Sequence, residues 1–216
     1  MFHPLDDIRE AQKRGEAAGI PSICSAYTTV LSTALRGQKP VLIESTCNQV
    51  NQFGGYTGMT PAAFVTFVRG LAERNGFPPE NLILGGDHLG PSPWQEIPAE
   101  RAMQLAAEMV QAYVRAGYTK IHLDTSMKLG DENAAPDKPL DPELAARRTA
   151  WLAKAAESAC SDIGPQCILR YVIGTEVPIP GGAFAHEDGV QVTSVESAQN
   201  TLEIMQTAFA QAGLGA

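Results

Sequence analysis

Positive charge is scarce in this 216-residue chain, which has 16 Lys and Arg against 24 Asp and Glu and a net charge of −8. A nucleic-acid-binding surface needs a cluster of basic side chains, so this balance argues against nucleic acid as a partner. Every apolar run is far shorter than the roughly 20 residues of a membrane-spanning helix. No basic segment followed by an apolar one opens the chain as in a secretory signal. We expect a soluble, cytoplasmic protein without a membrane partner.

Paired cysteine motifs are also absent. The four cysteines are Cys24, Cys47, Cys160 and Cys167, with no CxxC or zinc-finger spacing among them. This pattern predicts reduced thiols in a cytosolic protein. Cys24 and Cys47 lie near predicted strand ends, where we expect them to be buried rather than reactive.

Nucleotide-binding glycine motifs are missing as well. No GxGxxG follows the first predicted strand and no GxxxxGK[ST] occurs anywhere, which disfavours the nucleotide-binding α/β proteins.

What the sequence does contain is a strand followed by a helix, five times. We expect strands over 20–25, 40–45, 82–88, 119–124 and 167–173. Helices are expected over 4–18, 28–35, from Pro61 after a Thr60 cap, over 98–116 and 141–160, and from a Thr193/Glu196 capping box. The last of these would bury Val195, Ala198, Leu202, Met205 and Phe209.

Polar residues recur where these strands end. Alternating strands and helices predict a parallel sheet, and a (β/α)₈ barrel carries its active site at the carboxyl ends of its strands. An open doubly wound sheet also binds ligands there. Five βα units cannot close eight strands, and the outer edge of the fifth would be exposed. We therefore expect one α/β domain over 1–216. It is either an open five-stranded sheet or a partial (β/α)₈ TIM barrel, the N-terminal portion of a longer one.

The segment Leu82–Pro91 is the centre of this pattern, because it delivers Asp87 and His88 side by side after two glycines. Adjacent residues on a strand point to opposite faces. At a strand end the chain begins to turn, so both side chains can reach one polar cleft. The alternative is that Asp87 caps a turn and His88 is a buried, hydrogen-bonded histidine.

Four segments closely resemble the non-catalytic, Z-type subunit of D-tagatose-1,6-bisphosphate aldolase: Leu42–Pro61, Ile83–Pro91, Lys120–Asp124 and Tyr171–Pro178. The amide- and glycine-rich loop over 48–59 is the most specific of them, because no packing requirement dictates it. The resemblance runs through the whole chain but covers only the front half of that family. The family is in turn similar to the metal-dependent class II aldolases.

The resemblance implies roles for individual residues. In class II aldolases the acid of an Asp-His pair works in acid/base catalysis and the histidine binds zinc, which assigns these roles to Asp87 and His88. A site of this kind would bind a small sugar phosphate. Asp124, followed by Ser126, and Glu176 resemble the acids after the next two strands. The zinc site would be incomplete, since two further histidines come from later strands and catalytic zinc normally has three protein ligands. The full assignment is catalytic Asp87, Glu176 and Asp124, substrate-binding Ser45, Asn48, Asn51 and Ser126, and metal-binding His88 and Glu44.

The remaining histidines and basic residues are not expected to form the site. We expect His122 to be a packed histidine and His186 to lie in a solvated loop. Lys128 and Arg170 are the basic candidates for phosphate, and neither sits in a glycine cradle. The phosphates of a bound sugar would then be held elsewhere.

Two functions remain open at this stage. The first is an accessory subunit that binds and stabilises a catalytic aldolase chain. The second is a metal-dependent aldolase or ketose epimerase acting on its own through Asp87 and His88. Acids at strand ends favour the second, because a scaffold does not need them. The missing ligands, and the non-catalytic character of the family that the chain resembles, favour the first.

Overall fold

The computed structural model describes residues 3–37, 39–132, 140–174 and 194–215. Five parallel strands form one sheet in chain order. They are β1 (Ser22–Cys24), β2 (Val41–Thr46), β3 (Leu82–Leu89), β4 (Lys120–Leu123) and β5 (Arg170–Ile173). The helices are α1 (Pro4–Lys13), α2 (Thr28–Ala34), α3 (Pro61–Arg74), α4 (Ala99–Ala116), α5 (Pro142–Ile163) and α6 (Val195–Gln211).

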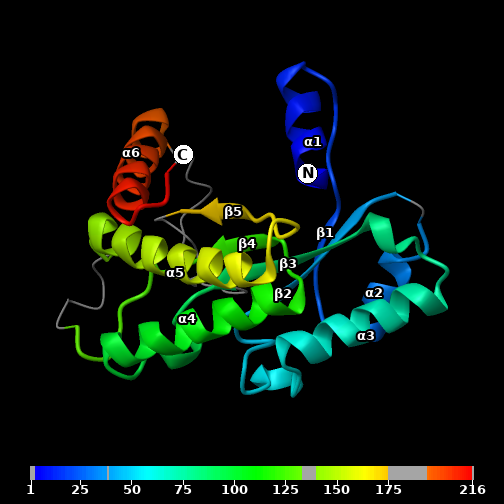
Figure 1. The fold of residues 1–216 in the computed structure, drawn as a ribbon, viewed down its shortest axis with the longest axis horizontal. Coiled ribbons are helices and arrows are strands. Elements are labelled where there is room, and N and C mark those ends of the chain that lie inside the picture. Colours follow the sequence, from blue (N-terminus) through cyan, green and yellow to red (C-terminus); the bar gives the residue numbers. More distant parts are fainter. Residues whose placement is uncertain (1–2, 38, 133–139, 175–193, 216) are drawn as a thin grey trace, which may run out of the picture.

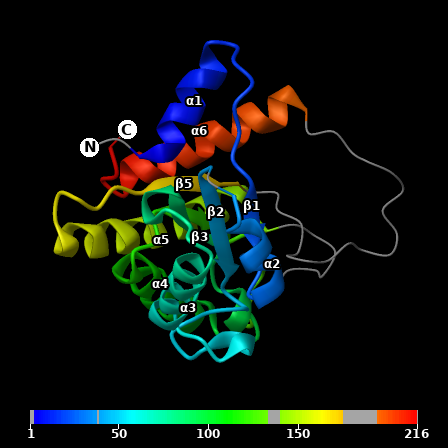
Figure 2. The same ribbon diagram turned by 90° about the vertical axis from the view of Figure 1, so that its right-hand side faces the viewer.

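The strand order decides between the two sheet types that alternation leaves open. A doubly wound sheet reverses its strand order at a switch point, whereas here each strand pairs with the next one along the chain. Helices α3, α4 and α5 lie along one side of the sheet, and α1 lies on the opposite side (Figures 1 and 2). This arrangement is a partial (β/α) barrel, as predicted.

The main core lies between the outer face of the sheet and its helices. Ile43, Leu84 and Ile121 point outward from consecutive strands and pack in one cluster with Phe64 of α3 and Met109 of α4. Full burial of such a side chain stabilises the fold by roughly 1.5–3 kcal/mol. The inner face carries Leu42 and Ile83 and, beyond them along the strands, polar residues that form the candidate site.

Helix ends coincide with residues typical of caps in three places, at Thr60, Asp141 and Gly117. Thr60 accepts a hydrogen bond from the Ala63 amide before α3, and Asp141 accepts one from the Glu143 amide before α5. Gly117 ends α4 in a left-handed conformation with φ 97°. These confirm the predicted positions of the longest helices.

Other predictions about the helices are wrong. Ser194 caps α6 by accepting from the Ser197 amide, and Thr193 lies outside the described residues. Val195 is 75% and Leu202 is 55% exposed, so α6 buries only Met205 and Ala208. The first helix ends at Lys13, because a left-handed Gly15 follows it. No helix in the described part of the chain is both long and apolar enough to cross a membrane.

The cysteines also differ from expectation. Cys160 at the end of α5 and Cys167 before β5 form a disulfide, with their Cα atoms 5.4 Å apart. The prediction of four reduced thiols is therefore wrong, because the short turn after α5 brings these two together. Cys47 is buried as predicted, whereas Cys24 is exposed.

Candidate metal-binding cluster on the inner face of the sheet

Strand register aligns charged residues in a row across the inner face. Cys24 pairs with Glu44, Glu44 with Gly85, Gly85 with Lys120, and Lys120 with Arg170. Gly85 leaves the middle of this row without a side chain. A Cβ there would lie 2.7 Å from Glu44 Oε1, so glycine is what allows the Glu44 side chain to extend over β3.

A β-bulge places Asp87 and His88 on the same face. Gly86 pairs with Ile121 but Leu89 pairs with Leu123, so two residues of β3 oppose the single residue His122 of β4. His88 adopts the left-handed conformation with φ 49°, the one non-glycine residue in the described chain with positive φ. Such a backbone costs roughly 1–3 kcal/mol and persists where the surroundings enforce it. The two side chains thus lie close together on one face of the sheet, and a cleft that receives both stays a prediction.

Three side chains of metal-binding type meet at this bulge. Asp87 Oδ1 lies 2.9 Å from His122 Nδ1, and Asp87 Oδ2 lies 3.3 Å from His88 Nδ1. The two imidazole rings are 4.3 Å apart between centroids. One ligand atom from each of the three residues lies within 4.8 Å of the others. His122, which the sequence led us to treat as packing, is thus a full member of the cluster.

The charges of the cluster support one another. Burial raises the pKa of Asp87, but hydrogen bonds from His122 and His88 and the positive charges of His88 and Lys120 outweigh it. The net result is a pKa of Asp87 held well below its usual range. The Asp87 carboxylate in turn raises the pKa of His88, and burial opposes this only in part. Asp87 is therefore ionised at neutral pH.

The donor set fits a divalent cation such as Zn²⁺. Imidazole nitrogens and a carboxylate oxygen are the ligands that zinc and similar metals take. His88 Nδ1 is buried and, apart from the Asp87 carboxylate 3.3 Å away, has no partner within the described residues. An imidazole nitrogen in this state, next to a carboxylate and a second imidazole, is suited to bind a metal.

Glu44, predicted as a metal ligand, has other partners. Its Oε1 accepts from Lys120 Nζ at 2.5 Å, and its Oε2 accepts from the Ser22 hydroxyl. Lys120 Nζ also lies 3.8 Å from Asp87 Oδ1. Glu44 thus forms an ion pair with Lys120, and its role as a metal ligand stays a prediction. Sequence reasoning missed Lys120, although its place two residues before His122 on the same strand puts both on one face.

Two of the other predicted site residues, Asp124 and Ser126, lie next to the cluster. Asp124 is buried at the end of β4, and its Oδ1 accepts from both the amide and the hydroxyl of Ser126. Asp124 also contributes to the raised pKa of His88, after the larger effects of Asp87. Asp124 and Ser126 thus lie beside the cluster. Glu176 and His186 lie outside the described residues.

Ser45 and Asn51 have structural partners instead. Ser45 faces the helices, is fully buried, and shares its hydroxyl with Tyr113 and Tyr118 at 3.2 Å each. Asn51 binds the Cys47 carbonyl through Nδ2 and accepts from two loop amides through Oδ1. These bonds shape the loop after β2 and do not bring either side chain to the cluster.

The rest of that loop is equally well ordered by backbone contacts. Asn48, also predicted to bind substrate, accepts from the Tyr56 amide through its carbonyl. Gly55 has φ 54°, and a Cβ there would lie 2.5 Å from the Gln49 carbonyl oxygen. The specific glycine and amide string is therefore explained by the compact course of the loop.

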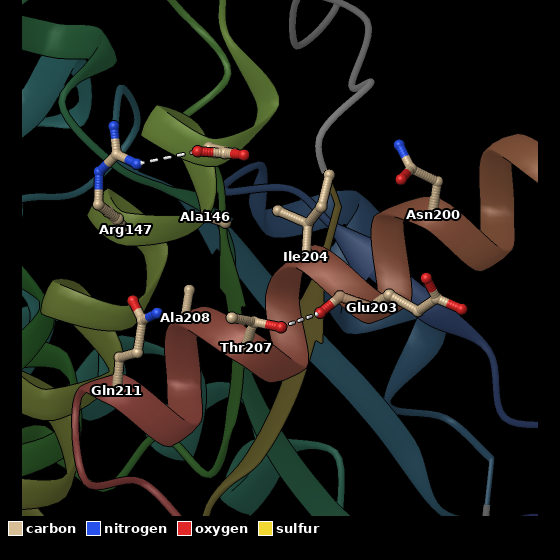
Figure 3. A pocket seen from close by; sticks show the side chains of 9 residues that line it. Ala146, Arg147, Asn200, Glu203, Ile204, Thr207, Ala208 and Gln211 are labelled. Atoms are coloured by element: carbon tan, nitrogen blue, oxygen red, sulfur yellow. Dashed lines mark hydrogen bonds and ion pairs between the residues drawn. The ribbon is translucent and has the colours of Figure 1, made fainter.

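A cavity of about 390 Å³ between α5 and α6 is separate from this cluster. Arg147 lies on its α5 side with Glu143, and Asn200, Ile204 and Thr207 project from α6 (Figure 3). None of its lining residues belongs to the inner face of the sheet.

Comparison with known proteins identifies the family. The family model described as "D-tagatose-1,6-bisphosphate aldolase subunit GatZ/KbaZ-like" matches residues 5–216. The chain belongs to this GatZ/KbaZ-like family. The D-tagatose-1,6-bisphosphate aldolase subunit GatZ of Salmonella heidelberg (strain SL476) is 52% identical over 215 residues, which are 97% of this chain and 49% of the relative. The GatZ subunit of Salmonella typhimurium is 51% identical over 214 residues, with the same coverage of both chains. The predicted resemblance is confirmed.

A solved structure agrees with this chain in fold. A probable tagatose 6 phosphate kinase from Sinorhizobium meliloti 1021 is 46% identical and superposes with a TM-score of 0.75. The match covers 91% of this chain and 46% of that one. The chain thus spans about half the length of the relatives it matches.

Proposed function

We propose that this chain is part of an accessory subunit of a D-tagatose-1,6-bisphosphate aldolase that acts in the cytoplasm. The observation that carries the proposal is the 52% identity to a GatZ subunit over 97% of the chain. In this role the chain binds and stabilises a catalytic aldolase subunit and does not itself turn over the sugar phosphate. The acidic inner face offers few groups for phosphate, since Arg170 is already paired with Asp6.

Within this role, His88, His122 and Asp87 would hold a divalent cation such as Zn²⁺. In an aldolase, such a cation polarises a ketose carbonyl and stabilises the negative charge that develops there. In this chain, Asp87 holds and orients the two imidazoles. Asp124 and Ser126 lie beside the cluster and are our candidates for contacting a bound small molecule.

The second candidate, an independent metal-dependent aldolase or epimerase, has less support. It would assign acid/base chemistry to Asp87, Asp124 and Glu176. The relatives are named as subunits of an aldolase, and Glu44, a metal ligand in this second reading, is bound by Lys120 and Ser22.

Co-expression with a catalytic aldolase subunit tests the proposal. Aldol cleavage of tagatose 1,6-bisphosphate would be measured for this chain alone, for the catalytic subunit alone and for the purified pair. We expect this chain alone to be inactive and the pair to be more active and longer-lived than the catalytic subunit alone. Asp87→Ala should leave the activity of the pair unchanged, like the matched control Asp7→Ala on the exposed side of α1. Metal-dependent turnover by this chain alone would overturn the proposal.

A further inference from the structure

Lys120 is a charged residue of the inner face that has no role in the proposed function. Its Nζ lies 2.5 Å from Glu44 Oε1 and 3.8 Å from Asp87 Oδ1. The Lys120 side chain is 10% exposed and the Glu44 side chain 7% exposed. A buried ammonium group thus lies between two carboxylates that come from different strands.

The backbone is built to permit this contact. Glu44 and Lys120 are each the direct neighbour of Gly85 in the strand register, one on each side of it. Because Gly85 has no side chain, the two residues meet above β3. Ser22 occupies the second oxygen of Glu44 and so fixes the orientation of its carboxylate. Buried charges require partners of this kind, and here each has one.

The same surroundings argue against Lys120 as a nucleophile. A lysine that forms a Schiff base attacks as the neutral amine and is activated by apolar surroundings or by a second cation. Lys120 Nζ lies within 4 Å of two carboxylates instead, so neither of these activating features is present. The position therefore suits a fixed positive charge.

We propose that Lys120 supplies a fixed positive charge on the inner face of the sheet. This charge determines how strongly the adjacent cluster of Asp87, His88 and His122 binds a divalent metal. Its ammonium group balances Glu44 and Asp87, as a metal ion would at the same place, and opposes a second cation at His88, His122 and Asp87. Lys120 thus acts on metal binding through its charge and is not itself a ligand. The inference rests on the cation site of the proposed function.

Titration with Co²⁺, followed by calorimetry and by visible absorption, tests the inference. Lys120→Met should raise the affinity of the cluster for Co²⁺ at least about tenfold, because a positive charge 3.8 Å from a ligand is removed. Lys120→Arg keeps the charge and should keep the wild-type affinity. Lys154→Met removes an exposed lysine of α5 and is the matched control, with no change expected.

Glu44→Gln should change the Co²⁺ affinity in the opposite direction to Lys120→Met. Without the Glu44 charge, the ammonium group of Lys120 pairs with Asp87 alone and competes more strongly for it. We expect Co²⁺ affinity to fall by about threefold or more, with the visible spectrum of the bound ion unchanged, because Glu44 is not a ligand in this proposal. If Lys120→Met does not fold, as judged by circular dichroism, this variant decides: wild-type affinity in Glu44→Gln overturns the inference.

The outcomes separate this inference from the proposed function. Equal Co²⁺ affinity in folded wild type and Lys120→Met overturns the role of Lys120 and leaves the cation site intact. Binding by Lys120→Met but not by wild type supports the role of Lys120 and overturns the cation site in the native chain. Absence of binding in both overturns both.

Discussion

Glu44 and Ser45 are adjacent in β2, yet they belong to different parts of the molecule. Glu44 points inward to Lys120 and Ser22, whereas Ser45 points outward to Tyr113 and Tyr118. The alternation of side chains along a strand causes this difference. A polar residue at a strand end is therefore a site candidate only if it occupies an inward position, and Ser45 does not.

Ser45→Ala should test this interpretation at the level of one hydroxyl. The substitution leaves two buried tyrosine hydroxyls with one partner fewer, although Tyr113 keeps its 2.8 Å bond to the Val50 carbonyl. We expect the free energy of unfolding in urea to fall by about 1 kcal/mol, with Co²⁺ affinity unchanged. Ser161→Ala, an exposed helix position, should change stability by less than about 0.5 kcal/mol. A loss of cation binding without a loss of stability would contradict the structural role.

At the scale of elements, the sequence supports the five strands, most helix starts and the pairing of Asp87 with His88. The spacing of apolar residues, helix caps and turn residues are all local features of the sequence. The helix ends at Thr60, Asp141 and Gly117 could therefore be predicted without a structure. The partners of Lys120 and His122 could not, because they depend on strand register and on a bulge. The exposed face of α6 was mispredicted for the same reason, since an apolar period does not reveal what covers it.

The bulge itself makes a prediction about His88. At φ 49° a Cβ is strained and glycine is not. We expect His88→Gly to be more stable than His88→Ala by about 1 kcal/mol, measured by urea unfolding. The same pair of substitutions at His122, which has no positive φ in β4, should show the usual order, with alanine more stable than glycine. If alanine is also the more stable substitution at position 88, the left-handed conformation is not present in solution.

At the scale of the whole molecule, the first helix and the last strand of the sheet are held together directly. The Arg170 guanidinium of β5 forms a bidentate pair with the Asp6 carboxylate of α1, at 2.7 and 2.5 Å, across 164 residues of sequence. Helix α1 lies on the side of the sheet away from α3 and α4 (Figure 2). This pair therefore anchors α1 to β5 on the inner side of the sheet.

Acid should release that anchor. The hydrogen bond and charge of Arg170 lower the pKa of Asp6 from 3.8 to about 2, against the opposing effect of burial. A carboxyl group with a lowered folded-state pKa stabilises the fold above its unfolded value and loses that contribution as pH falls through the folded value. We therefore expect the stability difference between wild type and Asp6→Asn to be constant above about pH 5 and to shrink between pH 4 and pH 2. Arg170→Gln should remove most of the difference, as measured by urea unfolding in a double-mutant cycle. A difference of undiminished size in the Arg170→Gln background would show that Asp6 stabilises α1 through the hydrogen bond it accepts from the His3 amide and not through Arg170.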